Sequence, residues 1–303
     1  MVAGYRENTG LLTSVPGPAR IGRKAHRRRL KLAPGLPIAV LIVFAGLAIF
    51  APLLTSYSPT TQNLGTVLIP PAWTAKGTTA HLLGTDSFGI DVFTRLLYGA
   101  RVSMSIGLFS MLIAVVIGTL IGVAAGFLGG WVDSVLMRFT DVMLALPKLL
   151  VGLVIAIVIG PSYGNLILVL GFLTWPRIAR LVRGDSLAIR QTEYVRYSMA
   201  IGVLKPLVCA KHVIPNILST LLVATTLEVG SVILTEASLS FLGAGIPSPQ
   251  PSWGTMIADG QGMMATGWWI SLFPGLCIGA VVISCNTLGD WLRDRYDPKT
   301  KRS

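Results

Sequence analysis

Long apolar runs separated by short polar segments extend over most of the chain. The first run, residues 36–54, is long enough to cross the hydrocarbon core of a bilayer as a helix. Further apolar runs follow at about residues 102–127, 131–159, 164–181, 217–238 and 270–288. This pattern predicts an all-α polytopic membrane protein with six transmembrane helices.

The polar segment 55–100, between the first two spans, contains a short amphipathic pattern. Asp91 is placed to cap a helix that ends at Gly99. The apolar residues of this helix share one face: Val92, Phe93, Leu96 and Leu97. The pattern fits two arrangements equally well, an interfacial helix that lies along the membrane or a helix that packs against the core of the protein.

The second span carries a regular series of glycines. Gly118, Gly122 and Gly126 recur every four positions and form a smooth helix face. Such a face allows another helix to approach closely, which is how helices associate in lipid. Chance is the alternative explanation in a chain with 33 glycines.

The third span carries charge and a proline. Asp133, Arg138, Asp141 and Lys148 lie in its first half, and Pro147 is expected to kink the helix. Pairing of Asp133 or Asp141 with Arg138 would lower the cost of charge near the lipid headgroups.

The composition agrees with a membrane protein. Hydrophobic residues make up 52% of the chain and charged residues 13%, which is about half the charge of a soluble domain. The three cysteines have no metal-like spacing, and their odd number argues against a disulfide framework.

Lysine and arginine, which give the chain a net charge of +12, are divided unequally between the two sides of the predicted membrane. With the N-terminus inside, 20 of the 25 lie in cytoplasmic segments and three lie outside. The positive-inside rule therefore predicts a plasma (inner) membrane protein with both termini cytoplasmic. Membrane lipid is an expected partner, whereas nucleic acid is not, because no stacking aromatic residues are interleaved with the basic ones.

These patterns divide the chain into segments of different character. They are a basic cytoplasmic tail, 1–35; a first transmembrane helix, 36–54; an extracytoplasmic loop with the amphipathic helix, 55–100; a core of five transmembrane helices, 101–290; and a cytoplasmic tail, 291–303. The core contains a polar cytoplasmic segment, 185–216, which is the longest polar insertion in the second half of the chain.

The sequence contains no motif for catalysis or nucleotide binding. It lacks the dipeptide Gly-Lys and therefore a P-loop for ATP, and it has neither an H-E-x-x-H nor a G-x-S-x-G motif. We therefore expect no catalytic residue, no metal and no cofactor in this chain.

Several residues on the predicted outer side have ordinary explanations. His81 is expected to be solvated, and the pair Met263-Met264 is expected to serve packing rather than metal binding. The tryptophans of this side are placed like an interfacial aromatic belt: Trp253, Trp268 and Trp269.

Two acids, Glu228 and Glu236, lie in or at the end of the fifth span. An ionisable group at membrane depth is a candidate functional residue. Because the two are eight residues apart, they lie on roughly one helix face. A role in a translocation or ion pathway and a structural role in hydrogen bonding near the outer end both remain open.

The segment 185–216 has the features of short capped helices. Ser186 is placed to cap a first helix that runs to Arg190, and Thr192 a second that runs to Met199. Gly202 is expected to end the second helix. Pro206 and Pro215 are expected to mark breaks before the fifth span. The segment is either a solvated loop or a docking surface that exposes Tyr194, Val195, Tyr197 and Met199.

At these residues the sequence resembles a known family. Glu193-Tyr194-Val195, Gly202 and Ile214-Pro215-Asn216 are similar to the cytoplasmic "EAA" loop of ABC importer permeases. Motifs elsewhere resemble the second permease subunit of the dipeptide/oligopeptide/nickel branch: Gly84-Thr85-Asp86, Asp91-Val92, Arg95, Leu97-Tyr98-Gly99-Ala100-Arg101, Glu236-Ala237-Ser238-Leu239-Ser240-Phe241-Leu242-Gly243 and Pro251-Ser252-Trp253-Gly254. The likeness covers about residues 36–290.

The resemblance implies a type I ABC importer permease that transports peptides and is not itself an enzyme. In such permeases the loop forms short coupling helices that sit in a cleft of a separate ATPase subunit. The implied partners are a homologous permease, which completes a heterodimer, two ATPase subunits or domains that bind ATP and Mg, and an extracytoplasmic substrate-binding protein. Glu193 would contact the ATPase, and Gly202 would set the turn between coupling helices.

Two positions depart from the family pattern. Tyr197-Ser198 replaces the usual Ala-Ala pair, and Ile90 replaces the arginine that usually precedes the acid of the outer motif. The resemblance leaves the solute open among dipeptides, oligopeptides and nickel chelates. The alternative function is an ion-gradient-driven secondary transporter that uses Glu228 and Glu236.

Overall fold

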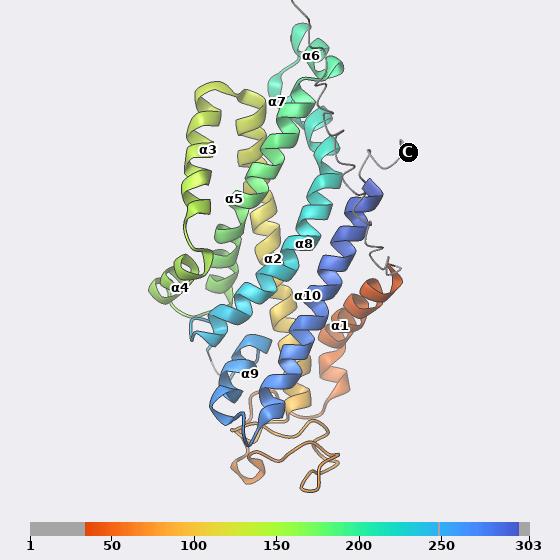
Figure 1. The fold of residues 1–303 in the computed structure, drawn as a ribbon, viewed down its shortest axis with the longest axis vertical. Helices are drawn as coiled ribbons and strands as arrows, with labels where there is room; N and C mark the ends of the chain where they lie inside the picture. Colours follow the sequence, from red (N-terminus) through yellow and green to blue (C-terminus); the bar gives the residue numbers. More distant parts are fainter. Residues whose placement is uncertain (1–33, 248, 297–303) are drawn as a thin grey trace, which may run out of the picture. The chain divides into compact units, whose positions relative to one another are not determined.

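The computed structural model describes residues 34–247 and 249–296, which are helical for most of their length (Figure 1). The basic N-terminal tail and Lys299, Lys301 and Arg302 of the C-terminal tail lie outside the described residues. Five described helices are long and apolar enough to cross a membrane: α1 (Gly35–Leu54), α2 (Val92–Val123), α5 (Tyr163–Arg190), α8 (Ile214–Phe241) and α10 (Trp268–Tyr296). The bent pair α3 (Gly130–Ala145) and α4 (Lys148–Ile159) makes a sixth, so the prediction of an all-α, six-span fold is confirmed.

Short helical elements connect the long ones. They are η1 (Leu64–Thr66), the π-helical turn η2 (Ala124–Leu128), α6 (Glu193–Ala200), α7 (Lys205–Val208), the π-helical turn η3 (Cys209–Val213), α9 (Trp253–Gly260) and η4 (Gln261–Met263). The segment before α2 and helix α9 lie at one end of the long helices, and α6 lies at the opposite end (Figure 1).

Helix α2 is the central element of the packing. Its most extensive partner is α5, and it also contacts α1 and α8, while α10 packs on α8, α9 and α1. The bent pair stands to one side, because α3 contacts α5 and α4 contacts α5 and α8 (Figure 1). The pair therefore depends on α5 for its position.

The glycine face formed by α2 and the following turn η2 packs against α5, as the spacing predicts. A Cβ added at Gly118, Gly122 or Gly126 would come within 2.6–2.8 Å of a backbone carbonyl oxygen of α5. The three oxygens belong to Trp175, Ala179 and Arg183. Because backbone atoms have few ways to move aside, the close approach of the two helices requires glycine at these positions.

The prediction that a short helix ends at Gly99 is wrong. Asp91 does cap the helix, since its Oδ2 accepts a hydrogen bond of 2.8 Å from the Thr94 amide, but α2 continues without a break to Val123. Gly99 serves packing instead, because a Cβ there would lie 3.1 Å from Cδ1 of Trp253. Val92 is fully buried, so the start of α2 packs against the core of the protein.

Buried ionic contacts join the segment before α2, which contains Asp86, to helices α2 and α9 (Trp253–Gly260). Arg95 of α2 is almost fully buried and pairs with Asp86 through one nitrogen and with Asp259 of α9 through another, the latter at 2.8 Å. Asp86 Oδ1 also accepts hydrogen bonds of 2.8 Å from the amides of Phe88 and Ile90. These contacts connect three separate parts of the chain at one end of the molecule.

Two expectations for the outer side are wrong. Trp253 and Trp269 are buried rather than placed in an aromatic belt, and each indole donates to a backbone oxygen, that of Leu96 at 3.2 Å and that of Thr85 at 3.0 Å respectively. His81 is also buried, with its Nδ1 3.0 Å from Oδ1 of Asp91. The two indole N–H groups and the His81 imidazole therefore have protein partners in place of solvent.

The break at Pro147 is confirmed and is sharper than a kink. Helix α3 ends at Ala145, α4 begins at Lys148, and their axes differ by 91°. With a rise of 1.5 Å per residue, the two helices are about 24 Å and about 18 Å long, and neither alone crosses a hydrocarbon core of about 30 Å.

The close contact between α2 and α5 predicts that one methyl group added at a glycine of α2 destabilises the protein. Gly122→Ala is expected to destabilise the protein by about 1–3 kcal/mol, because the new Cβ would meet a carbonyl oxygen at 2.6 Å and force the helices apart. Thermal unfolding of the purified chain in detergent, followed by tryptophan fluorescence, measures the change. Gly46→Ala in α1, where a Cβ would meet nothing within 4 Å, is the matched control, and an equal effect of the two changes would contradict the packing argument.

Candidate functional site

The first short helix expected in the segment 185–216 does not exist as a separate element. Helix α5 continues through this region to Arg190. Ser186 is fully buried inside α5, where it faces Gly126 of η2, so it does not cap a helix. The packing of α2 and η2 on α5 therefore extends the fourth span beyond its apolar run.

The second short helix is present as α6. Thr192 occupies the N-cap position with extended dihedral angles, but its hydroxyl donates to the carbonyl of Ile189 at 2.6 Å rather than capping α6. Gly202 follows the end of α6 with φ of +85°, a left-handed conformation that favours glycine. The prediction that Gly202 ends this helix is confirmed.

The two prolines of the segment lie in the first turns of helices. Pro206 lies in the first turn of α7, where a missing N–H costs nothing, and residues 201–204 separate α7 from α6, so the expected break at Pro206 is confirmed. Residues 205–241 form one helical run through η3, with Pro215 at the start of α8, so the expected break at Pro215 is wrong.

Most of the predicted coupling residues are at the surface. Glu193, Tyr194, Gly202, Pro215 and Asn216 are exposed. The amide of Asn216 donates to the carbonyl of His212 at 2.6 Å, a contact within the helical run.

Val195, in contrast, is fully buried, so its expected exposure is wrong. It belongs to the same buried apolar cluster as Val208 and Val213, and Met199 packs against that cluster. The inward face of α6 is thus anchored on α7 and η3. The outward side presents large apolar groups, with Tyr197, Ile201 and Leu204 exposed by 71%, 79% and 74%.

Arginines on α5 hold α3 in place. Arg183 makes a bidentate pair with Asp133, with N–O distances of 2.5 and 2.7 Å, and Arg180 pairs with Asp141 at 2.5 Å. The expected pairing of either acid with Arg138 is wrong, because α3 folds back along α5 and meets longer-range partners.

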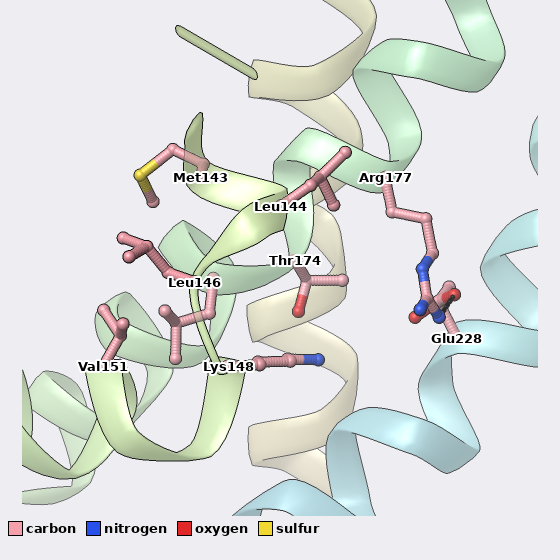
Figure 2. Close-up of a pocket in the computed structure, with 9 residues that line it drawn as sticks. Met143, Leu144, Leu146, Lys148, Val151, Thr174, Arg177 and Glu228 are labelled. Carbon is pink, nitrogen blue, oxygen red and sulfur yellow. Dashed lines mark hydrogen bonds and ion pairs between the residues drawn. The ribbon is translucent and has the colours of Figure 1, made fainter. Parts of the chain in front are cut away.

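A third arginine of α5 lies at a small cavity between the bent pair and the two long helices (Figure 2). Nη1 of Arg177 donates to Oε1 of Glu228 in α8 at 2.6 Å. Lys148, at the start of α4, extends into the same cavity, and Thr174 of α5 lines it. The cavity has a volume of about 110 Å³ and brings together three ionisable side chains from three helices.

Glu228 and Glu236 have different surroundings, although both lie in α8. Glu236 is fully buried and accepts hydrogen bonds from Ser103 at 3.1 Å and Ser240 at 2.8 Å. Two hydroxyl groups thus satisfy the Glu236 carboxylate. Glu228 lines the cavity with Lys148 and Arg177.

Lys148 and Arg177 are far from Glu228 in sequence, so no local pattern groups the three. Lys148 lies in the third predicted span and Arg177 at the end of the fourth, where basic residues are common. The useful signal was Pro147-Lys148 inside an apolar run, because a charge next to a helix break indicates a polar cavity at membrane depth. In the described part of the chain, no group of three or more histidine, cysteine or acidic residues is arranged to hold a metal ion.

Comparison with known proteins identifies the family. Residues 118–302 match the model of the binding-protein-dependent transport system inner membrane component. The chain belongs to this family. It is a membrane component of an ABC transporter, and the permease fold does not support the alternative of an ion-gradient-driven secondary transporter.

Relatives of this permease match over most of its length. It is 38% identical over 265 residues to the dipeptide transport system permease protein DppC of Alkalihalophilus pseudofirmus, covering 87% of this chain and 85% of that one. It is 39% identical to a di/tripeptide transport system permease protein DppC of Pseudomonas aeruginosa, covering 89% and 88%. It is 38% identical to the glutathione transport system permease protein GsiD of Pectobacterium atrosepticum, covering 73% and 74%.

A solved structure has the same fold. An amino acid ABC transporter crystallised with histidines matches with a TM-score of 0.51 and 14% identity, over 67% of this permease and 94% of that chain. At this identity the match supports the fold alone.

The two α3–α5 ion pairs predict unequal effects. Asp133→Asn is expected to loosen α3 by about 1–2 kcal/mol, because it disrupts a bidentate pair whose side chains are 19% and 33% exposed. Asp141→Asn is the matched control and should cost less than about 1 kcal/mol, since its pair is more than half exposed. Hydrogen exchange of the α3 amides measures both, and equal protection in the two variants would contradict this ranking.

Proposed function

We propose that this permease is one membrane subunit of an ATP-driven importer of peptides. It pairs with a homologous permease to form the translocation pathway and receives its solute from an extracytoplasmic binding protein. Two partner ATPase subunits or domains bind ATP and Mg and hydrolyse the ATP, so the permease itself is not catalytic. Its N- and C-termini are cytoplasmic, as the distribution of lysine and arginine indicates.

The observation that carries the proposal is the form of the segment 185–216. It places α6 beyond the ends of α5 and α8, with its inner side anchored and three large apolar side chains exposed (Figure 1). Apolar groups of this size on a polar segment favour a protein partner over water. The likeness of Glu193, Gly202 and Asn216 to the family's cytoplasmic loop supports an ATPase as that partner.

Peptides are the proposed solute because the relatives are named as transporters of small peptides. Two of the relatives described above are named as dipeptide and di/tripeptide permeases, and one as a glutathione permease. The three alignments cover 87%, 89% and 73% of this chain. A small solute with a peptide backbone is therefore the class that the proposal names.

Substitutions in the segment are expected to uncouple ATP hydrolysis from uptake. Glu193→Ala removes an exposed acid that faces the partner, and Gly202→Leu adds about 1–2 kcal/mol of backbone strain at a left-handed position. Each should lower peptide uptake per ATP by about tenfold while leaving membrane insertion intact. The assay uses the full complex with its binding protein in liposomes and measures uptake of labelled dialanine alongside phosphate release.

Matched controls use positions outside the segment. Asp290→Ala removes an exposed acid of α10, and Gly184→Ala changes a glycine of α5 that has nothing within 4 Å of its Cβ position. Both should retain full coupling. Unchanged uptake per ATP in both Glu193→Ala and Gly202→Leu would refute the coupling role.

A further inference from the structure

The cavity between α3, α4, α5 and α8 lies deep along the long helices. Glu228 of α8 is near the middle of the apolar run 217–238, and Arg177 of α5 lies in the last third of the apolar run 164–181. The bend of the α3–α4 pair lies at the same level, since Lys148 lines the cavity with them. Both positions fall within apolar runs long enough to span a bilayer, so the cluster lies at membrane depth, where charge is costly.

The helix break makes the cavity polar. The turn at Leu146 and Pro147 interrupts the helical hydrogen bonds, and no side chain caps the start of α4. Irregular backbone at membrane depth is tolerated where it lines a water-filled space or is buried in protein. Lys148 and Val151 of the first turn of α4 line the cavity, so the positive end of the α4 dipole is directed there.

The charges around the cavity do not balance. Lys148 and Arg177 contribute two positive charges, and Glu228 contributes one negative charge. Arg177 pairs with Glu228 at 2.6 Å, whereas Lys148 has no described acid within 4 Å and only a longer-range attraction to the same Glu228. The Arg177 side chain also stays 67% exposed, which leaves further N–H groups for a ligand. One anionic group would complete the cluster.

The size of the cavity limits what it can hold. A volume of about 110 Å³ accommodates a few waters at about 30 Å³ each, or a single small polar group. The cavity is partly open, so a peptide can place one end in it while the rest lies outside. The group that fits is therefore one end of a longer solute.

We propose that Lys148 and Arg177 bind the C-terminal carboxylate of a peptide as it passes through the permease. The carboxylate is the one anionic group that all unmodified peptides share, and Lys148 supplies the charge that no described protein group pairs. Glu228 orients the Arg177 guanidinium, so Arg177 and Glu228 together form the fixed side of the site. This inference rests on the proposed function, because it assigns a recognition site for the same solute.

The test compares peptides with and without the carboxylate. The full complex in liposomes is supplied with dialanine or with dialanine amide, each at a concentration that saturates the binding protein. Transport is expressed as peptide per ATP hydrolysed, which separates passage through the permease from delivery by the binding protein. The wild-type complex should transport dialanine about tenfold more efficiently than its amide.

Variants assign this preference to Lys148. Lys148→Met should lower dialanine transport per ATP to the level of the amide and leave amide transport unchanged. Lys148→Arg should keep the preference, because it keeps the charge. Arg138→Met is the matched control, since Arg138 is an exposed cation of α3 that does not line the cavity.

Each contrary outcome has a different meaning. Equal transport of the two peptides by the wild-type complex would overturn the carboxylate site, even if Lys148→Met failed to assemble. An equal decrease for both peptides in Lys148→Met would show that Lys148 has a structural role only. If the wild-type complex moved neither peptide with ATP and loaded binding protein, the proposed function would fail and this inference with it.

Discussion

The close approach of α2 and α5 is the contact on which the rest of the structure depends. It is set by Gly118, Gly122 and Gly126, whose missing side chains let α2 lie directly against backbone oxygens of α5. Because α5 is held on this side, its arginines are presented to other elements: Arg180 and Arg183 to α3, and Arg177 to α8. In the described structure α3 packs on α5 and η2, so a wider separation of α2 from α5 would also displace the bent pair.

The charged residues of this permease differ in how deeply they are buried and in how they are paired. Arg95, with two acidic partners, and Glu236, with hydroxyl donors, are fully enclosed and make structural contacts at one end of the helices. Arg183 and Asp133 are partly exposed and hold two helices together. Lys148 differs from all of these, because it lies at a helix break beside a cavity and has no ion-pair partner within the described ranges. An ionisable group at membrane depth is a candidate functional residue, and Lys148 shares its one nearby acid, Glu228, with Arg177.

The sequence predicted features that depend on local pattern, and it missed those that depend on contacts between distant residues. The spacing of three glycines, the break at Pro147 and the end of α6 at Gly202 were all visible as short-range signals. Gly99 was misjudged because the residue that needs its missing side chain, Trp253, is far away in the chain. Asp133 was paired with a neighbour on its own helix for the same reason, whereas its partner Arg183 is reached only after the chain reverses.

The segment 185–216 and the cavity at Lys148 are joined by two long helices, α5 and α8. Helix α5 carries Arg177 near its middle and leads into α6 at its end, and α8 carries Glu228 near its middle and is preceded by α7 and η3. Both helices continue without interruption from the cavity to the coupling segment. If the two helices move as rigid bodies, a change in the spacing of their ends at α6 changes the Arg177–Glu228 contact and the space beside Lys148. The geometry thus links the segment 185–216 mechanically to the Arg177–Glu228 contact through two continuous helices.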